Sequence, residues 1–147
     1  MNVRDALEAD ADAIAAIADA PTDVMRNLVH DRTVRVAEDG THDPNADVEE
    51  TRYNGSNPED LLGFISFDAQ NGTVHITQIE GTEDACERLL AEPVRFAERE
   101  SMAVEMLAPM GEDDVIAAAR ELGFEENGFG PQFDGARTIR FRLEVNT

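Results

Sequence analysis

The stretch LLGFISFDAQNGTVHITQIEGTEDACERLLAEPVRFAERESMAVEML, residues 61–107, holds the succession of elements that decides the fold. Residues 61–67 are apolar on both faces, which indicates a central strand. Asn71-Gly72 is a strong signal for a hairpin turn, and it leads into a second strand at 73–79. The first half of the stretch therefore predicts an antiparallel hairpin in the middle of a sheet.

A helical segment at 82–102 separates this hairpin from a third strand at 103–107. Because a crossover of this length joins strands that run in the same direction, strands 73–79 and 103–107 are predicted to be parallel. Pro93 lies inside the helical segment and predicts a kink or a break in it. The residues spaced for the buried face of this helix are Cys86, Leu89, Leu90, Val94 and Ala97.

The residues before this stretch predict a strand, two helices and another strand. Asn2–Ala6 forms the first strand, and an alanine-rich helix from Glu8 to Ala20 ends at Pro21. A short second helix follows, which Thr22 can cap, and Thr33–Glu38 alternates polar and apolar residues as a strand does. The inner face of the second helix is predicted to carry Val24, Met25, Leu28 and Val29.

The residues after the stretch predict a last helix and two more strands. Glu112–Leu122 has its apolar residues on one helical face and stops at Gly123. Phe124–Phe129 and Thr138–Val145 are the last two strands. The complete order, β-α-α-β-β-β-α-β-α-β-β, predicts an α+β fold with a mixed, mostly antiparallel sheet flanked by helices.

The length of 147 residues favours one domain over the whole chain, interrupted by a long polar segment at about 39–58. This segment is rich in Gly, Asn and Pro, and it is either a functional loop or an insertion. Its acids and its histidine lack the ligand spacing of a calcium loop, so a solvated acidic loop is favoured over a cation site, and no metal site is predicted. The residues concerned are His42, Asp43, Asp47, Glu49 and Glu50.

The charge composition points to the environment of the protein. The chain has no lysine, and its 12 arginines stand against 32 acidic residues, for a net charge of −20. Acids spread along the chain favour the cytoplasm of a salt-accumulating halophile, because carboxylates keep a surface hydrated and molar salt screens their repulsion. An acidic module that binds a basic protein is the alternative. Nucleic acid and anionic membranes are not expected as partners.

Three segments of the chain resemble the GNAT superfamily of N-acyltransferases. Val3–Ile17 resembles the first strand and acidic, alanine-rich helix of that family, and Leu61–Ile79, with Gly63-Phe64-Ile65, resembles its hairpin before the cofactor loop. Glu121–Glu125, which reads ELGFE, resembles the Leu-Gly-Phe ending of its last helix. The resemblance implies a GNAT-like fold and transfer of an acyl group from acetyl-CoA to a small-molecule or peptide amine.

The resemblance also implies a cofactor loop at residues 78–86. Family members place Arg or Gln, two residues, Gly, one residue and Gly or Ala there, so that backbone N–H groups at a helix N-terminus can hold a diphosphate. This chain matches the first four positions and then has Glu83 and Asp84, which also suit a helix N-terminus without any ligand. The implied cofactor-binding residues are Gln78, Ile79, Gly81, Thr82, Glu83, Asp84, Ala85 and Cys86.

The family's tyrosine, which protonates the leaving thiolate, has no counterpart in this chain. The matching position is Ala119, on the predicted buried face of its helix, and the only tyrosine, Tyr53, lies in the long polar segment. Some family members act without this acid, because a thiolate is a fair leaving group. The missing tyrosine therefore leaves both an active enzyme and a catalytically silent protein as alternatives.

His75 and Glu80 are the candidate catalytic bases. His75 lies on the strand that leads to the cofactor loop, and histidine can accept a proton from an ammonium group at neutral pH. The alternative is a histidine packed on the polar face of a strand, and for Glu80 it is a surface charge. Cys86 occupies an inward position, which favours a core residue over a nucleophile.

Two further groups of residues near the C-terminus have competing interpretations. Arg137, Arg140 and Arg142 form a basic patch that could bind a carboxylate or phosphate, although pairing with nearby acids is favoured. An apolar group could line a pocket, although ordinary core is favoured. Its members are Met102, Met106, Met110, Phe129 and Phe133.

The sequence thus predicts an N-acyltransferase with acyl-CoA bound between strands 73–79 and 103–107. One alternative is a catalytically silent GNAT-fold module that binds a ligand or a protein and could form a homodimer through a sheet edge. Another is an α+β domain unrelated to acyl transfer. Free N–H groups facing an open cleft at 78–86 favour the enzyme, whereas Glu83 or Asp84 turned back onto those N–H groups favours the silent module.

Overall fold

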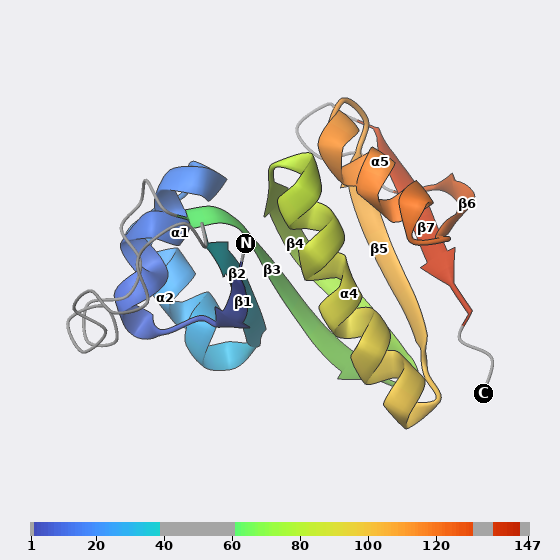
Figure 1. The fold of residues 1–147 in the computed structure, drawn as a ribbon, viewed down its shortest axis with the longest axis horizontal. Helices are drawn as coiled ribbons and strands as arrows, with labels where there is room; N and C mark the ends of the chain where they lie inside the picture. The colour runs from blue at the N-terminus through green and yellow to red at the C-terminus, as the bar shows by residue number, and fades with distance from the viewer. Residues whose placement is uncertain (1, 39–60, 131–136, 145–147) are drawn as a thin grey trace.

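The computed structural model describes residues 2–38, 61–130 and 137–144. Within them, seven strands form one sheet in the order β1-β2-β3-β4-β5-β7-β6 (Figure 1). Only β4 and β5 pair in parallel, so the prediction of a mixed, mostly antiparallel sheet is confirmed. The strands are β1 Asn2–Asp5, β2 Thr33–Glu38, β3 Leu61–Gln70, β4 Thr73–Gly81, β5 Ala103–Pro109, β6 Glu125–Phe129 and β7 Thr138–Leu143.

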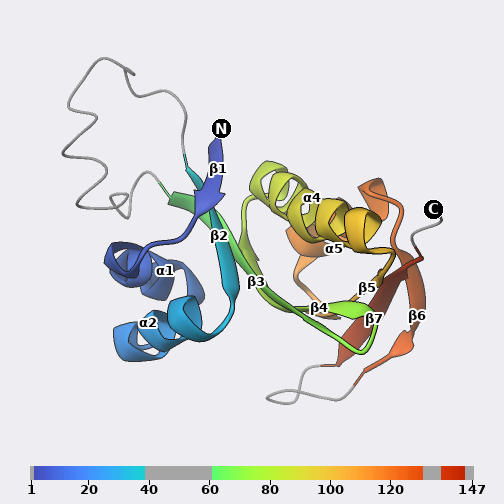
Figure 2. The ribbon, with the colours of Figure 1, turned by 90° about the horizontal axis from the view of Figure 1, so that it is seen from below.

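Helices cover different parts of the two faces of the sheet. In Figure 2, α4 and α5 lie on one face, whereas α1 and α2 lie on the other, under β1–β3 and away from β5 and β7. This leaves part of the second face without a helix among the described residues. The helices are a 3-10 turn η1 at Glu8–Asp10, α1 Ala11–Ala18, α2 Thr22–Asp31, α4 Glu83–Glu100 and α5 Asp113–Glu121.

Each helical layer packs on the sheet around its own hydrophobic core. Under α4 and α5 the sheet contributes fully buried side chains that include Ile65, Val74 and Phe141. Under α1 and α2 the core includes Ile14 and Phe64, which are also fully buried. The predicted order of elements is confirmed, and the alternation of neighbouring residues along β3 between the two cores explains why this strand is apolar on both faces.

The predicted break at Pro93 does not occur, because α4 continues from Glu83 to Glu100. Proline removes one helical N–H and clashes with the preceding turn, which destabilises a helix interior. Here Pro93 is buried, and fully buried residues lie on both sides of it, Leu89 and Leu90 before and Ala97 after. Packing of these residues on the sheet holds the helix together through the proline.

Two predictions for α2 are wrong. Thr22 is the first helical residue and not the cap, since Pro21 occupies the N-cap position and its carbonyl oxygen accepts from the N–H groups of Val24 and Met25. Val24 is 52% exposed, whereas Met25 is buried. At 100° per residue Val24 lies at the edge of the face that Met25 defines with the half-buried Leu28, so it turns toward solvent.

A buried ion pair fixes the N-terminal strand to the elements beside it. Asp10 is fully buried, and the guanidinium of Arg4 donates to both of its carboxylate oxygens, at 2.8 and 2.9 Å. The same guanidinium donates to Glu38 at 3.2 Å, and the N–H of Leu7 donates to Asp10 at 2.7 Å. The charges of this cluster are thus paired and serve to join β1, η1 and β2.

Candidate active site

The parallel strands β4 and β5 are paired at one end and separate at the other. Their pairing runs from Thr73 opposite Ala103 to Ile76 opposite Met106 and then stops, although β4 continues to Gly81 and β5 to Pro109. Both strands end where α4 and α5 begin (Figure 1). The separated ends therefore open toward two helix N-termini.

A β-bulge in β4 lies at the point of separation. On the β3 side, Ser66 pairs with Gln78 and Phe67 pairs with Ile76, so Thr77 is the extra residue. The Thr77 hydroxyl lies 2.6 Å from that of Ser66 and donates to the Ser66 carbonyl oxygen at 3.1 Å. A bulge bends its strand and increases the local twist, which turns β4 away from β5.

The separation creates a cleft of about 770 Å³. Its walls are the two strands, the start of α5 and one side of β7, and it contains both candidate bases. The lining residues are His75, Ile76, Thr77, Gln78, Ile79, Glu80, Glu105, Met106, Leu107, Ala108, Pro109, Glu112, Val115, Thr138 and Arg140.

Strand register shows which face of the sheet the candidate bases occupy. Val74 and Ile76 lie in the core beneath α4, so His75, between them, points to the opposite face. Glu80 pairs with Phe64, which belongs to the core of α1 and α2, and paired residues share a face. His75 and Glu80 thus lie on the face that α4 does not cover.

Glu80 has the environment of a strengthened base. Its side chain is half-buried, and this loss of solvation raises the pKa of its carboxyl above the ordinary value. The negative charges of Glu112 and Asp19 raise the pKa further, while a hydrogen bond from Gln78 opposes the shift. A carboxylate with a raised pKa accepts a proton from an ammonium group more readily than an ordinary glutamate does.

His75 and Glu80 stand at different depths of the cleft. His75 is exposed and lies in the paired part of β4, between Asp68 of β3 and Glu105 of β5. Glu80 is five residues further along, at the open end, and a strand of that length spans about 15 Å. The structure places both residues in the cleft but does not bring them together on one reacting atom.

Thr82 is the N-cap residue of α4. The Thr82 hydroxyl accepts from the N–H of Ala85 at 3.2 Å, and the Thr82 carbonyl oxygen accepts from Cys86. Ala85 and Cys86 are fully buried, whereas Glu83 and Asp84 are exposed. Within the described residues the N–H groups of Glu83 and Asp84 donate no hydrogen bond, so neither acid is folded back over the helix end.

Gly81 must be glycine because its backbone touches the neighbouring strand. Its φ is +147°, and a Cβ there would meet the Leu62 carbonyl oxygen at 2.5 Å and the Gly63 Cα at 2.7 Å. A Cβ on Gly63 would meet the Glu80 carbonyl oxygen at 2.6 Å. This close approach of β3 and β4 sets the direction in which the chain enters α4.

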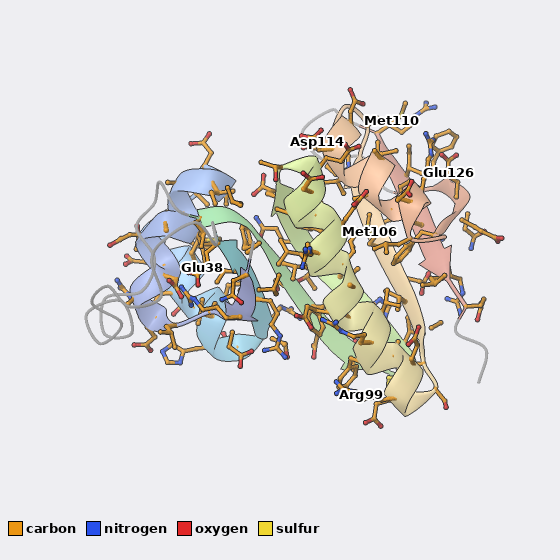
Figure 3. All side chains as sticks on the ribbon, viewed as in Figure 1. Glu38, Arg99, Met106, Met110, Asp114 and Glu126 are labelled. Atoms are coloured by element: carbon orange, nitrogen blue, oxygen red, sulfur yellow. The ribbon has the colours of Figure 1, made fainter. Side chains whose placement is uncertain are left out.

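Cys86 is a core residue and not a nucleophile. Its thiol is fully buried, and burial raises the pKa to about 12, helped by the negative charges of Asp114, Glu112 and Glu80. Asp114 lies at the start of α5 (Figure 3). The thiol therefore stays protonated at neutral pH and contacts the Gly81 carbonyl oxygen at 3.7 Å.

The predicted basic patch on β7 is divided by the structure. Arg142 pairs with Glu105 at 3.1 Å and with Glu144, as predicted. Arg137 lies over the Phe129 ring, 5.2 Å from its centroid. Arg140 lines the cleft and makes no ion pair within the described residues.

The predicted apolar group near the C-terminus is mostly not a pocket. Met106 is buried under α4 and α5 and only borders the cleft (Figure 3). Met102 is half-buried on the same core, whereas Met110 and Phe129 are 51% and 61% exposed. Phe133 and Tyr53 fall outside the described residues, and Ala119 is fully buried, as predicted.

Glu105, Leu107 and Glu112 line the cleft without having been predicted from the sequence. Their positions in the chain could have identified them. Glu105 and Leu107 are alternate residues of a strand parallel to β4, and Glu112 lies at the start of the next helix, so all three reach the same edge of the sheet as Glu80. Among residues 2–38, 61–130 and 137–144 no group of acidic, histidine or cysteine side chains could hold a metal ion. The predicted loop acids from His42 to Glu50 lie outside those ranges.

In the described part of the chain, every helix is too short or too polar to cross a membrane. No family model matches the sequence, and no curated protein matches it by sequence comparison.

Solved structures, in contrast, match over the whole length of the chain. NAA60 of Arabidopsis thaliana in complex with a bisubstrate analogue has a TM-score of 0.72 at 14% identity, covering 99% of this chain and 98% of that one. The ribosomal-protein-alanine N-acetyltransferase of Brucella melitensis has a TM-score of 0.71 at 16% identity, covering 99% and 100%. An N-acetyltransferase of Staphylococcus aureus has a TM-score of 0.72 at 14% identity, covering 99% and 98%.

NAA60 has also been solved with acetyl-CoA. Other structural neighbours include a structure described as an acetyltransferase of the GNAT family. Together with the seven-stranded sheet and the separated β4 and β5, these likenesses show that the chain has the GNAT acyltransferase fold.

Proposed function

We propose that this protein is an acetyl-CoA-dependent N-acetyltransferase that acts on an amine. The observation that carries the proposal is the cleft between the separated ends of β4 and β5, which is lined by both candidate bases. Strands that part in this way leave backbone N–H and C=O groups without a strand partner. An extended ligand arm can bind such groups as an added strand would.

The start of α4 suits the diphosphate of CoA. Two N–H groups, those of Glu83 and Asp84, are free there within the described residues, and the helix dipole favours an anion. The acidic side chains oppose it, since two like charges about 6 Å apart repel by roughly 3 kcal/mol at an effective dielectric of 20. Molar salt removes most of this repulsion, so the proposed site would bind the diphosphate best in a halophilic setting.

The chemistry needs a base and a leaving group. The amine must lose its proton to attack the thioester carbonyl, and the carbon–sulfur bond then breaks to release CoA thiolate. His75 and Glu80 are the candidate bases in the cleft, and either can accept the proton directly or through water. The position of the family's tyrosine is the buried Ala119, and the described residues contain no tyrosine, so the proposal relies on thiolate being a fair leaving group.

Calorimetric titration with acetyl-CoA in about 2–3 M KCl tests the proposal. We expect micromolar binding that weakens strongly at low salt, and Asp84→Asn should restore much of the low-salt affinity. Glu98→Gln, an exposed charge near the other end of α4, is the matched control and should leave the low-salt affinity unchanged. Gly81 is unsuitable for this purpose, because any side chain there collides with Leu62.

Turnover is then measured as CoA thiol release with a panel of amines. Glu80→Gln and His75→Gln should separate the two candidate bases, since loss of a general base lowers the rate by about 10²–10⁴-fold. The proposal is wrong if the folded protein does not bind acetyl-CoA in high salt.

A further inference from the structure

Arg140 stands in the cleft with no acidic partner among the described residues. It lies in the middle of β7, directly opposite Leu107 of β5, and both residues line the cleft. Its side chain is exposed and makes no ion pair or side-chain hydrogen bond within the described part of the chain. The combination of a cleft position and no described acidic partner sets Arg140 apart.

Other arginines show how this protein ordinarily uses the residue. Arg4 binds the buried Asp10 through two nitrogens, and Arg142, two positions along β7 from Arg140, pairs with Glu105. Arg88 and Arg99 also lack an ion pair within residues 2–38, 61–130 and 137–144, but they lie on α4 and do not line the cleft. Within the described residues Arg140 is thus the arginine that lines the cleft, and its side chain is exposed.

Strand register assigns Arg140 to the same face as the candidate bases. Met106 pairs with Phe141, and both belong to the core beneath α4 and α5. Leu107 and Arg140 therefore point to the opposite face, as His75 and Glu80 do. The start of α4 belongs to the layer on the other side of the sheet, so Arg140 is directed away from the proposed diphosphate site.

The cleft consequently has two walls of opposite charge. Glu80 lies near the end of β4 and Glu112 at the N-cap position of α5, and the negative charge of Glu112 contributes to the raised pKa of Glu80. The third carboxylate, Glu105, is paired with Arg142. Arg140 stands on β7, two strands from β4, a separation of about 10 Å where strands are paired. A ligand that spans these walls needs a cation at one end and an anion at the other.

We propose that the amine substrate is an amino acid and that Arg140 binds its carboxylate. This inference rests on the proposed function and names the substrate class of the same cleft. A guanidinium can hold a carboxylate through two parallel hydrogen bonds, while the ammonium group turns toward the acidic wall of Glu80. Leu107, opposite Arg140, offers an apolar surface for the substrate's side chain.

The test compares amino acids with the amines that lack their carboxylate. The matched pairs are alanine with ethylamine, phenylalanine with phenethylamine, and tryptophan with tryptamine, each assayed with acetyl-CoA in high salt. We expect wild-type protein to prefer the better amino acid over its amine by about 10- to 100-fold in kcat/KM, the range that a charge-assisted hydrogen bond supports. Arg140→Gln should raise KM for the amino acid by a similar factor and abolish the preference.

Two variants control for other effects. Arg140→Lys keeps the charge without the fork geometry and should recover part of the preference. Arg137→Gln removes the same charge from an arginine that stacks on Phe129 and does not line the cleft, and it should leave KM unchanged. Equilibrium dialysis measures the binding of N-acetylated amino acids to wild-type and Arg140→Gln protein. It tests the contact between Arg140 and the carboxylate without requiring turnover.

The outcomes separate this inference from the proposed function. Absence of acetyl-CoA binding defeats the proposed function, and absence of any carboxylate-dependent binding or turnover defeats the amino-acid proposal even if acetyl-CoA binds. If Arg140→Gln instead weakens acetyl-CoA binding measured without an amine, Arg140 contacts the phosphates of CoA and the proposal is overturned. Equal turnover of both members of each pair by wild-type protein also overturns it.

Discussion

The two ends of the β4–β5 pair differ in what their side chains contact. At the paired end, Val74 lies beside Val104, and both are fully buried beneath α4. At the separated end the same strands leave a cleft of about 770 Å³. The change occurs within one residue, at the Thr77 bulge, so one inserted position turns a closed sheet into a candidate binding site.

Along this one pair of strands, the paired end contributes to stability and the separated end to the candidate site. Side chains at the paired end are covered on the α4 side and fix the distance between the strands. Side chains at the separated end, such as Glu80 and Leu107, face the cavity and carry charge or exposed apolar surface. We therefore expect substitutions to affect folding at one end and ligand binding at the other.

The largest expected effect is at the point where β4 leaves the sheet. Gly81→Ala should destabilise the protein by about 4 kcal/mol, because the new Cβ meets the Leu62 carbonyl oxygen and the φ of +147° is strained for alanine. Gly72→Ala is the control, since that glycine has a φ of +77° but a Cβ there would meet no described atom within 4 Å, and about 1 kcal/mol is expected. Chemical unfolding in high salt measures both, and equal losses would contradict the close approach of β3 and β4.

Adjacent residues of β5 should divide stability from activity. Met106→Ala should cost about 3 kcal/mol, because its side chain is buried in the core beneath α4 and α5. Leu107→Ala should cost less than about 1 kcal/mol, because that side chain is 38% exposed in the cleft, and its effect should fall on KM for the amine. Similar losses of stability from the two variants would show that the strand faces are wrongly assigned.

The two threonines at helix starts provide a smaller test. Thr82→Ala removes the hydroxyl that accepts from the Ala85 N–H and should destabilise the protein by about 1 kcal/mol. Thr22→Ala should change stability by less than about 0.5 kcal/mol, because Pro21 and not Thr22 occupies the N-cap position of α2. Thermal unfolding of both variants decides whether a threonine caps α4 but not α2.

The smallest expected effect is the pH dependence that Glu80 contributes. Its pKa is raised in the folded protein, chiefly by loss of solvation, so the ionised carboxylate disfavours folding. This penalty is absent below the ordinary glutamate pKa of 4.5 and grows as pH rises through the folded value. Glu80→Gln should therefore stabilise the protein at neutral pH by a few tenths of a kcal/mol after solvent screening, and not in acid.

Unfolding of wild type and Glu80→Gln at a series of pH values measures this difference. Glu98→Gln removes an exposed charge from α4 and controls for the change in net charge. A stabilisation by Glu80→Gln that increases toward acidic pH would contradict a raised pKa for Glu80 in the folded protein.

The sequence predicted the paired end of these strands better than the separated end. Hydrophobic periodicity located the strands, and the helical crossover required β4 and β5 to be parallel. The expectation that acyl-CoA binds between them came from the resemblance to the GNAT superfamily. The Thr77 bulge escaped prediction, because register depends on which residues of β3 face β4 and not on the local sequence. Pro93 and Val24 were misjudged for a similar reason, since packing across the molecule decides both.

The candidate site shows the same limit. His75 and Glu80 were predicted from their places on the strand that leads to α4, and both line the cleft. The different fates of Arg140 and Arg142 could not be predicted, since each depends on the side chain opposite it on β5, Leu107 in one case and Glu105 in the other. Charge near a strand becomes a binding group only where no partner is within reach.

Hydrogen exchange with and without acetyl-CoA, in about 2–3 M KCl, tests the central claim most directly. The account predicts slower exchange confined to the separated end, in peptides that cover residues 77–84 and 107–109, with little change at 73–76. No protection at a saturating concentration of acetyl-CoA, or protection confined to residues outside the cleft, would contradict the claim that these separated strands form an acetyl-CoA site.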